Sequence, residues 1–439
     1  MAKPVVSITK YVDAYESVAR AVDLCDGLEN LRPNDRILLK PNLVEWDLEL
    51  PFSPWGVVTT SAVMGALVRV LAERGFGDLT IGEGTPLPYL AGKGREVFGL
   101  LGYGALRDRY GVELVDFDEE PFDNVDLGDF KLAVARRALE ADKIITVPTL
   151  KTHATCQVSL GIKNLKGCIS RTSKRFCHHR TLDLDHTFPL LVEKLPVALN
   201  LIDGVFALER GPTQSGRAYR KDLLVASADV YAGDVVGAKL LGYDVDQVPH
   251  LHWHGERRGG AVGLETIDVR GERIEEQSTA LPWDTPWLED GSGPAAFDKL
   301  GISGLAFRKP DASLCTNCVA VMAPALVLLM TAHDREKAGT LEVLNGKKAL
   351  ASKGFDHTLL LGRCVSALNK NNPNINHAIT LNTCPPDMET LVTELRALGL
   401  ECDYDTYRQF RKKACGRYKA ENGFDMGLYR PSAAAAVAG

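Results

Sequence analysis

Short apolar runs alternate with amphipathic stretches along the first third of the chain. Runs typical of buried strands occupy residues 5–9, 36–39, 78–81, 112–116 and 143–147. Apolar residues at spacings of three and four predict helices at Tyr15–Cys25, Ser61–Gly75 and Lys131–Ala141. This alternation is typical of an α/β fold, so we expect a largely parallel sheet flanked by helices.

Loops rich in Pro, Gly, Asn or charged residues follow three of these strands. They occupy residues 40–47, 82–88 and 149–153. In open α/β sheets, ligands bind outside the carboxyl ends of the strands. We therefore expect a ligand site where these loops meet.

The rest of the chain is predicted to complete one domain and to form a second. A strand with a glycine-containing loop at 199–216, then a strand and a helix at 223–242, complete an α/β domain of residues 1–250. Residues 251–310 are rich in Gly, Pro and charge, and predict a linker region with some β structure. Residues 311–430 predict a smaller C-terminal α/β unit. Its apolar run Val319–Ala332 is shorter than the roughly 20 residues of a membrane span, so we interpret it as a buried helix.

Net charge and cysteine content indicate which binding partners and which cellular compartment the protein is expected to have. The formal net charge of −6 argues against nucleic acid or an acidic membrane surface, because either partner would favour a basic protein. The N-terminal residues lack the basic and apolar pattern of a secretory signal, so we expect a cytoplasmic protein. In that reducing compartment, the ten cysteines are expected to be metal ligands, catalytic groups or core residues rather than disulfides.

Four cysteines are expected to converge at one edge of the C-terminal unit. Cys315 and Cys318 form a CxxC motif at the start of a predicted helix, whose partial positive charge lowers thiol pKa values. Cys364 and Cys384 each follow a predicted strand, and Cys384 precedes a proline, as the fourth ligand of many ferredoxin-type clusters does. The ends of parallel strands lie side by side, so all four sulfurs are expected to meet.

Four thiolates suit either a 4Fe-4S cluster or a zinc ion. A bare dithiol for redox exchange and unliganded core cysteines are further alternatives. We favour the cluster because the ligands span Cys315 to Cys384, in a unit large enough to need no zinc for folding. With four protein ligands the irons have no open position, which favours electron transfer over Lewis-acid catalysis.

A second group of chemically active residues lies between Val147 and Arg180. This segment concentrates cations, amides and glycines, namely Lys151, His153, Gly161, Lys163, Asn164, Lys166, Gly167, Lys174, His178 and His179. Such a composition suits a site for a carboxylate or phosphate, and a solvated basic face is an equally good interpretation. Cys156, Cys168 and Cys177 in the same segment are more often core residues than ligands.

Another candidate metal site is the run His250, His252 and His254. In an extended chain its three imidazoles would share one face and form a metal site, but a surface strand or loop is the simpler interpretation.

The motifs LLKPNLV, VPTLKTHATCQVSLGIKNLKG, LIDGVFALERGPTQSG and LLVASADVYAGDVVGAKLLG resemble the domain-of-unknown-function family 362, over roughly residues 5–251. Members of that family are often joined to ferredoxin-like cluster modules, whereas this chain lacks a CxxCxxCxxxC run. The resemblance implies functional roles for its motif positions, which are Lys40, Asn42, Lys151, His153, Lys163, Asn164, Asp203, Gly204, Gly211, Pro212 and Asp234.

The leading hypothesis is a redox enzyme that passes electrons from a 4Fe-4S cluster to a small anionic substrate or cofactor. In this scheme the catalytic residues are His153, as proton donor, with Lys151, Lys163 and Asn164. The cofactor-binding residues are Lys40, Asn42, Asp203, Gly204 and Gly211, and an electron donor is required as a partner. A homo-oligomer in which a second chain completes the site is left open.

Two alternatives keep the same fold. One is a binding or maturation factor without turnover, in which the cysteines hold a structural cluster or zinc. The other is a non-redox isomerase or lyase, because the fold resembles in broad outline that of the lactate racemase family.

Overall fold

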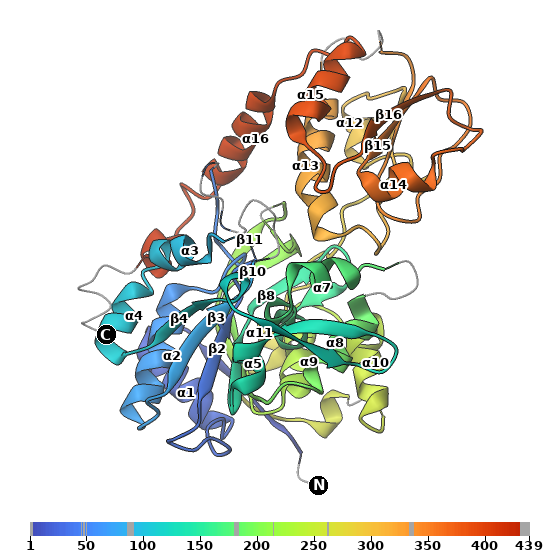
Figure 1. Cartoon of the computed structure of the whole chain (residues 1–439). Coiled ribbons are helices and arrows are strands. Elements are labelled where there is room, and N and C mark those ends of the chain that lie inside the picture. Colours follow the sequence, from blue (N-terminus) through green and yellow to red (C-terminus); the bar gives the residue numbers. More distant parts are fainter. Residues whose placement is uncertain are drawn as a thin grey trace.

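The computed structural model describes residues 3–44, 46, 49, 51–85, 92–179, 184–213, 215–260, 263–332 and 338–430. They form a mixed α/β structure with a large sheet, a smaller four-stranded sheet and a two-stranded β5-β6 ribbon (Figure 1). The larger sheet has ten strands in the described residues and is mostly parallel, as the sequence predicts. Its main path runs in the order β12-β1-β11-β10-β7-β2-β3-β4, and a short β8-β9 hairpin extends from β10.

The strands of the large sheet are β1 (Val5–Lys10), β2 (Ile37–Pro41), β3 (Leu79–Glu83), β4 (Glu113–Asp116), β7 (Lys143–Val147), β8 (Thr149–His153), β9 (Gln157–Ser159), β10 (Val197–Gly211), β11 (Ala218–Ser227) and β12 (Asp268–Gly271). The helices around it are α1 (Ala14–Leu24), α2 (Ser61–Glu73), α3 (Gly94–Leu100), α4 (Gly104–Tyr110), α5 (Arg136–Glu140), α6 (Gly161–Asn164), α7 (Arg171–Phe176), α8 (Leu184–Val192), α9 (Val230–Leu240), α10 (Pro249–Arg257) and α11 (Ile274–Gln277).

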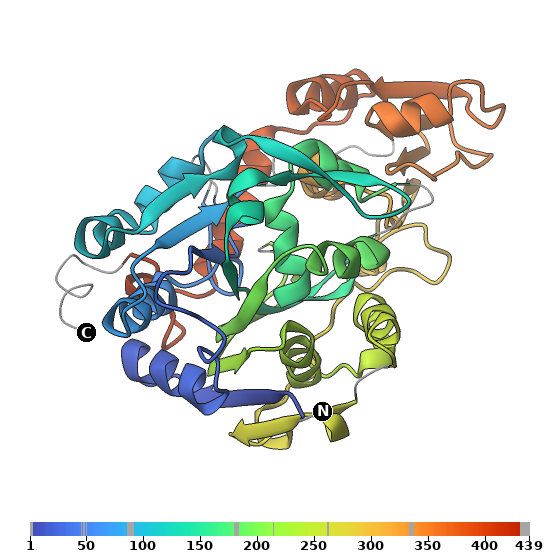
Figure 2. The ribbon, with the colours of Figure 1, turned by 60° about the horizontal axis from the view of Figure 1, so that its bottom comes forward.

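Helices cover both faces of this sheet (Figure 2). The side chains of α1 and α2 pack on one face, and those of α8, α9 and α10 pack on the other. Several helices begin at a polar cap, such as Asp13 before α1 and Thr60 before α2, whose side chains accept backbone N–H groups of the first turn. The central strands β2, β3 and β7 are buried along almost their whole length because helices cover both faces of the sheet.

The second unit is a four-stranded parallel sheet in the order β13-β14-β15-β16. Its elements are α12 (Ala296–Lys299), β13 (Leu305–Phe307), α13 (Thr316–Thr331), β14 (Leu341–Leu344), β15 (His357–Leu361), α14 (Arg363–Leu368), β16 (His377–Leu381) and α15 (Met388–Ala397). The predicted buried helix is α13, and Val321, Ala325 and Leu328 pack it on one face of the sheet. In the described residues no helix is long and apolar enough to cross a membrane.

The chain then returns to the first unit. Helix α16 (Tyr404–Gly416) runs back toward the large sheet, as Figure 1 shows. Arg411 donates from Nη2 to the carbonyl oxygen of Pro51 at 2.9 Å, and Tyr418 and Tyr429 are buried in the core beside α2. The segment predicted as a linker, residues 251–310, contributes β12 to the first sheet and β13 to the second.

Three predictions of local structure are wrong. Residues 131–135 form strand β6 (Lys131–Ala135) rather than the start of a helix, because they pair antiparallel with β5 (Phe122–Asp126). The predicted loop 149–153 is strand β8, which is buried on both faces between β10 and β9.

The histidine run lies on helix α10 instead of an extended segment or loop. His250 and His254 point into the core, whereas His252 is partly exposed beside Asp246. A helix turns by 100° per residue, so the alternate residues of this run do not share a face.

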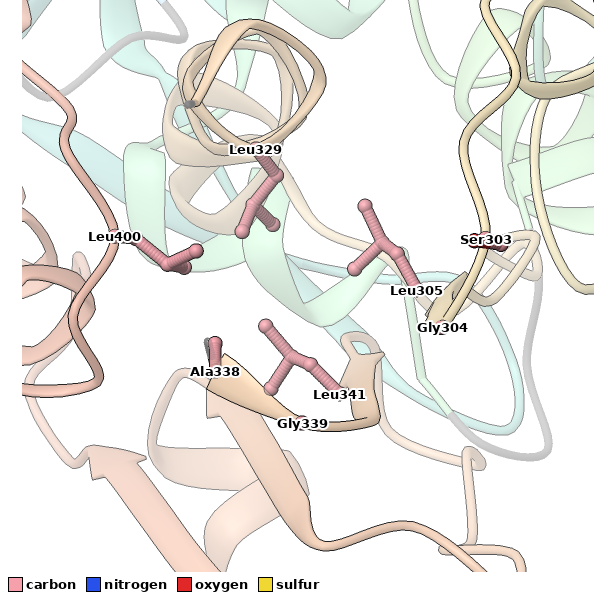
Figure 3. Close-up of a pocket in the computed structure, with 8 residues that line it drawn as sticks. All are labelled: Ser303, Gly304, Leu305, Leu329, Ala338, Gly339, Leu341 and Leu400. Carbon is pink, nitrogen blue, oxygen red and sulfur yellow. The ribbon is translucent and has the colours of Figure 1, made fainter. Parts of the chain in front are cut away.

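A small cavity of about 20 Å³ lies in the second unit, between Leu305, Leu329, Leu341 and Leu400 (Figure 3). Leu305 and Leu341 are the first residues of their strands, so the cavity lies at the amino edge of the sheet. Its volume is close to that of one water molecule and its lining is apolar, so we interpret it as a packing gap.

Candidate functional site

A buried ion pair lies at the carboxyl edge of the large sheet. The Nζ atom of Lys40, at the end of β2, is 2.6 Å from Oε2 of Glu83, at the end of β3, and both side chains are buried. Glu83 also accepts the backbone N–H groups of Leu43 and Gly84. A Cβ atom on Gly167 would lie 2.1 Å from Glu83 Oε1, so only glycine lets this loop pass over the pair.

The predicted residues Asn42, Lys151 and Asn164 join one hydrogen-bond network beside that pair. Lys151 Nζ donates to Asn42 Oδ1 at 2.6 Å and to the Val57 carbonyl at 2.9 Å. Asn42 Nδ2 donates to Asn164 Oδ1 at 3.3 Å, and Asn164 Nδ2 donates to the Lys40 carbonyl at 2.9 Å. The structure thus brings four of the predicted residues together with fixed orientations.

A group of lysine and histidine side chains lies in and beside this network, and we refer to it as the cationic site; its members are Lys151, His153, Lys163, Lys166 and His178. Lys163 Nζ is 3.2 Å from Ser159 Oγ, and Lys166 Nζ is 2.9 Å from His178 Nε2. Neither Lys163 nor Lys166 forms an ion pair with any residue in the described part of the chain. Two buried lysines without a carboxylate partner among the described residues suit the binding of an anion.

Burial changes the protonation of this site. Burial, with repulsion from Lys163 and Lys174, lowers the pKa of Lys166 to about 8. Burial and the neighbouring lysines hold the pKa of His153 well below its usual value, so His153 is neutral near pH 7. Its Nδ1 atom accepts the backbone N–H of Thr155 at 3.1 Å, which assigns the ring proton to Nε2.

The remaining predicted residues of the first unit support the backbone around the site. Asp203 accepts the N–H of Thr60 at 2.7 Å and so holds the start of α2. Gly204 and Gly211 lie in β10, where a Cβ atom would meet a carbonyl oxygen of the next strand at 2.9 Å and 2.6 Å, respectively. Gly211 pairs with His153 across the sheet, so its small size lets β8 lie close to β10.

The four predicted cysteines lie at the carboxyl edge of the second sheet, and we call this the cysteine edge. Cys315 precedes the first turn of α13, and Cys318 lies in that turn. Cys318 Sγ lies 3.8 Å from the carbonyl oxygen of Leu361, the last residue of β15. Asn317 Nδ2 donates to Cys384 Sγ, past the end of β16, at 3.3 Å. Cys364 lies in the first turn of α14 and is exposed, as is Cys384.

These thiols affect one another electrostatically. A hydrogen bond from Cys318, helped by N–H groups at the start of α13, lowers the pKa of the Cys315 thiol to about 5. That hydrogen bond and burial raise the pKa of Cys318, and the charges of Cys315, Cys384 and Cys364 raise it further. Within the described residues, however, no three His, Cys, Asp or Glu side chains are arranged so that they could hold a metal ion as they stand.

Four soft sulfur donors, one of them readily ionised, nevertheless have the chemistry that an iron–sulfur cluster requires. Positive charge from Lys347 further favours a thiolate at Cys315. The donor set of the cysteine edge therefore fits such a group.

The cationic site and the cysteine edge meet at His178. Its Nε2 atom faces Lys166, and its Nδ1 atom is 3.1 Å from the carbonyl oxygen of Ala312, three residues before Cys315. Lys347, three residues after the end of β14, donates to the carbonyls of Arg175 and His178. Arg175 Nη1 in turn lies 3.9 Å from Cys384 Sγ.

Most of the first unit matches a known protein family. Residues 37–239 match the family Domain of unknown function (DUF362). The DUF362 match includes every family motif position named from the sequence, from Lys40 to Asp234, and none of the four cysteines. The cysteine edge therefore lies outside the matched region.

A curated relative is the thylakoid-associated protein sll1697 of Synechocystis sp. It is 29% identical over 237 residues, which are 51% of this chain and 69% of the relative. Among solved structures, the lactate racemase apoprotein from Thermoanaerobacterium thermosaccharolyticum has 13% sequence identity and a TM-score of 0.32. That comparison covers 55% of this chain and 57% of the racemase chain.

Sequence reasoning gave no role to Glu83, Arg175 or Lys347. Glu83 has a recognisable signal, since it lies in the loop that follows a predicted strand. Arg175 and Lys347 have none, because their positions depend on how the second unit docks on α7. Cys156, Cys168 and Cys177 are buried among apolar side chains on one face of the large sheet.

Proposed function

We propose that this chain is an iron–sulfur oxidoreductase that reduces a small anionic substrate or cofactor bound at the cationic site. The observation that supports this most is the junction at His178. A single imidazole contacts Lys166 of the cationic site and the loop that precedes Cys315. Electron transfer requires the two sites to be close.

Cys315, Cys318, Cys364 and Cys384 would hold a 4Fe-4S cluster, which supplies single electrons when it is bound. Those electrons come from an external one-electron donor, which is oxidised by one electron for each that the substrate gains. Arg175 and Lys347 place positive charge beside the cysteine edge and so offset the negative charge of the thiolates.

The lysines of the cationic site would bind the anionic group of the substrate, and Asn42 and Asn164 would fix the position of Lys151. Lys166 fits the role of proton donor better than His153. Its pKa of about 8 is close to neutral pH, where an acid is both protonated and able to release its proton. The neutral His153 would donate a hydrogen bond from Nε2 to the bound anion.

The experiment compares electron uptake with anion binding in anaerobically purified protein. Dithionite should convert the wild-type protein to a paramagnetic state, and sulfate should alter the spectrum of that state. Cys384→Ala should abolish the paramagnetic signal and leave sulfate binding unchanged. Wild-type protein that contains iron but shows no signal and no response to sulfate would contradict the proposal, as would zinc in place of iron.

A further inference from the structure

A buried asparagine at the cysteine edge has no hydrogen-bond partner. Asn345 follows the last residue of β14, and its side chain is only 2% exposed. In the described structure neither Nδ2 nor Oδ1 of this amide has a partner. Burying an amide without a hydrogen bond costs about 1–3 kcal/mol in proteins, so such a group indicates a missing partner.

The alternation of side chains along β14 directs Asn345 toward the start of α13. Leu341 and Val343 lie on the face of the sheet that α13 covers, whereas Leu344 lies on the other face. Continuing this alternation by one residue directs Asn345 toward α13. The paired residues Leu344 and Leu360 bring Asn345 alongside Leu361, whose carbonyl contacts the Cys318 thiol.

The residues that follow Asn345 hold it against the loop before Cys315. Lys347 donates its backbone N–H to Ser313 Oγ at 2.7 Å. Gly346 lies against the same loop, since a Cβ there would be 3.3 Å from Ser313 Oγ. Asn345 therefore lies between the segment that carries Cys315 and the strand end that contacts Cys318.

We propose that Asn345 donates a hydrogen bond from Nδ2 to sulfur in the group that the four cysteines hold, and so raises its reduction potential. This inference rests on the proposed function. Asn317 offers a parallel within the same site, because its Nδ2 already donates to Cys384 Sγ. Reduction adds negative charge to the sulfurs, and a donor N–H group stabilises that charge.

The test is a redox titration of the loaded protein, followed by its visible absorbance and paramagnetic signal. Asn345→Leu removes the donor, and Asn345→Asp replaces it with an acceptor of the same shape. Both variants should retain iron and sulfide. At a fixed potential the ratio of reduced to oxidised protein should fall about tenfold, a shift of about 59 mV for one electron.

Thr358→Val is the matched control. Thr358 Oγ1 is also buried without a partner in the described residues, but it lies near the amino end of β15, away from the cysteine edge. This variant should have the wild-type potential.

Three results would overturn the assignment. Asn345→Leu and Asn345→Asp could both hold iron at the wild-type potential, which would show that Asn345 does not contact the sulfurs. Asn345→Leu could lose iron while Asn345→Asp kept the wild-type potential, which would make Asn345 a packing residue. Wild-type protein without iron would instead reject the proposed function, and this inference with it.

Discussion

The burial of Lys166 affects how the cationic site binds an anion, because burial lowers the pKa of this lysine. It contacts His178 and stands close to the charges of Lys163 and Lys174. A buried lysine of this kind loses its proton more easily than an exposed one, and a bound anion would restore its preference for the charged form. Anion binding should therefore depend on the protonation of Lys166.

Sulfate affinity is expected to be constant below about pH 8 and to fall above it. The reason is the pKa of about 8 at Lys166, above which the free protein has lost this charge. Calorimetric titration with sulfate measures this directly, because sulfate keeps its charge over the range. Lys174 has a similar pKa and donates to the Gly84 carbonyl, so variants must separate the two lysines.

Lys166→Met should weaken sulfate binding about tenfold and remove the fall above pH 8, whereas the exposed Lys194→Met should bind as wild type. An unchanged pH profile in Lys166→Met would assign the effect to another group.

Asp234 organises the backbone of the basic segment. Its two oxygens accept the N–H groups of Gly161 and Ile162 at 2.7 Å and 2.8 Å, and Oδ1 also accepts from Asn200 Nδ2. We expect Asp234→Ala to lower the free energy of unfolding in urea by about 3 kcal/mol, because several buried donors lose their acceptor. A loss below about 1 kcal/mol would show that water replaces the carboxylate.

The pH dependence of stability gives a second test of Asp234. Burial raises its pKa from 3.8 to about 7, so the folded state binds this proton more tightly than the unfolded state. The contribution of Asp234 to the free energy of unfolding should therefore be greatest below about pH 4 and should decrease as the pH rises through 7. Asp234→Asn should lack this decrease when urea unfolding is compared across the range.

At the scale of elements, the short 3-10 turn Leu165–Cys168 lies directly over the Lys40–Glu83 ion pair. Gly167→Ala should push this turn away from the pair, since the new Cβ would overlap Glu83 Oε1. We expect a loss of about 2–4 kcal/mol in unfolding free energy and weaker sulfate binding. Gly99→Ala on α3 is the control, because a Cβ there meets no atom within 4 Å. Equal unfolding free energies and equal sulfate affinities in Gly167→Ala and Gly99→Ala would contradict this arrangement.

Lys347, which follows β14, provides one of the contacts between the two units at the end of α7. Lys347→Met removes the hydrogen bonds to the carbonyls of Arg175 and His178. Amide hydrogen exchange in residues 171–179 should become faster, while exchange in β2 and β7 should stay unchanged. The exposed neighbour Lys348→Met should exchange as wild type. Unchanged exchange in Lys347→Met would mean that other contacts hold the junction.

At the scale of the whole molecule, the parallel core could be predicted because its strands are apolar and its helices amphipathic. Predictions of secondary structure were wrong where pairing between strands outweighs the local pattern of apolar and polar residues. Lys131–Ala135 has helical spacing but pairs with β5, and Thr149–His153 is polar in sequence but buried as a strand. The approach of Asn42 and Lys151 follows from their places after the neighbouring strands β2 and β7, whereas Asn164 reaches them from the end of α6. The contact of His178 with Ala312 could not be predicted, because it depends on the docking of two units.

The most direct test of the central proposal is the iron, acid-labile sulfide and zinc content of anaerobically purified protein. We expect about four irons and four sulfides per chain in the wild type. Cys384→Ser should lose them, and Cys415→Ser, in α16 away from the cysteine edge, should keep them. One zinc with no iron, or iron that persists in Cys384→Ser, would contradict a redox cluster at these four cysteines.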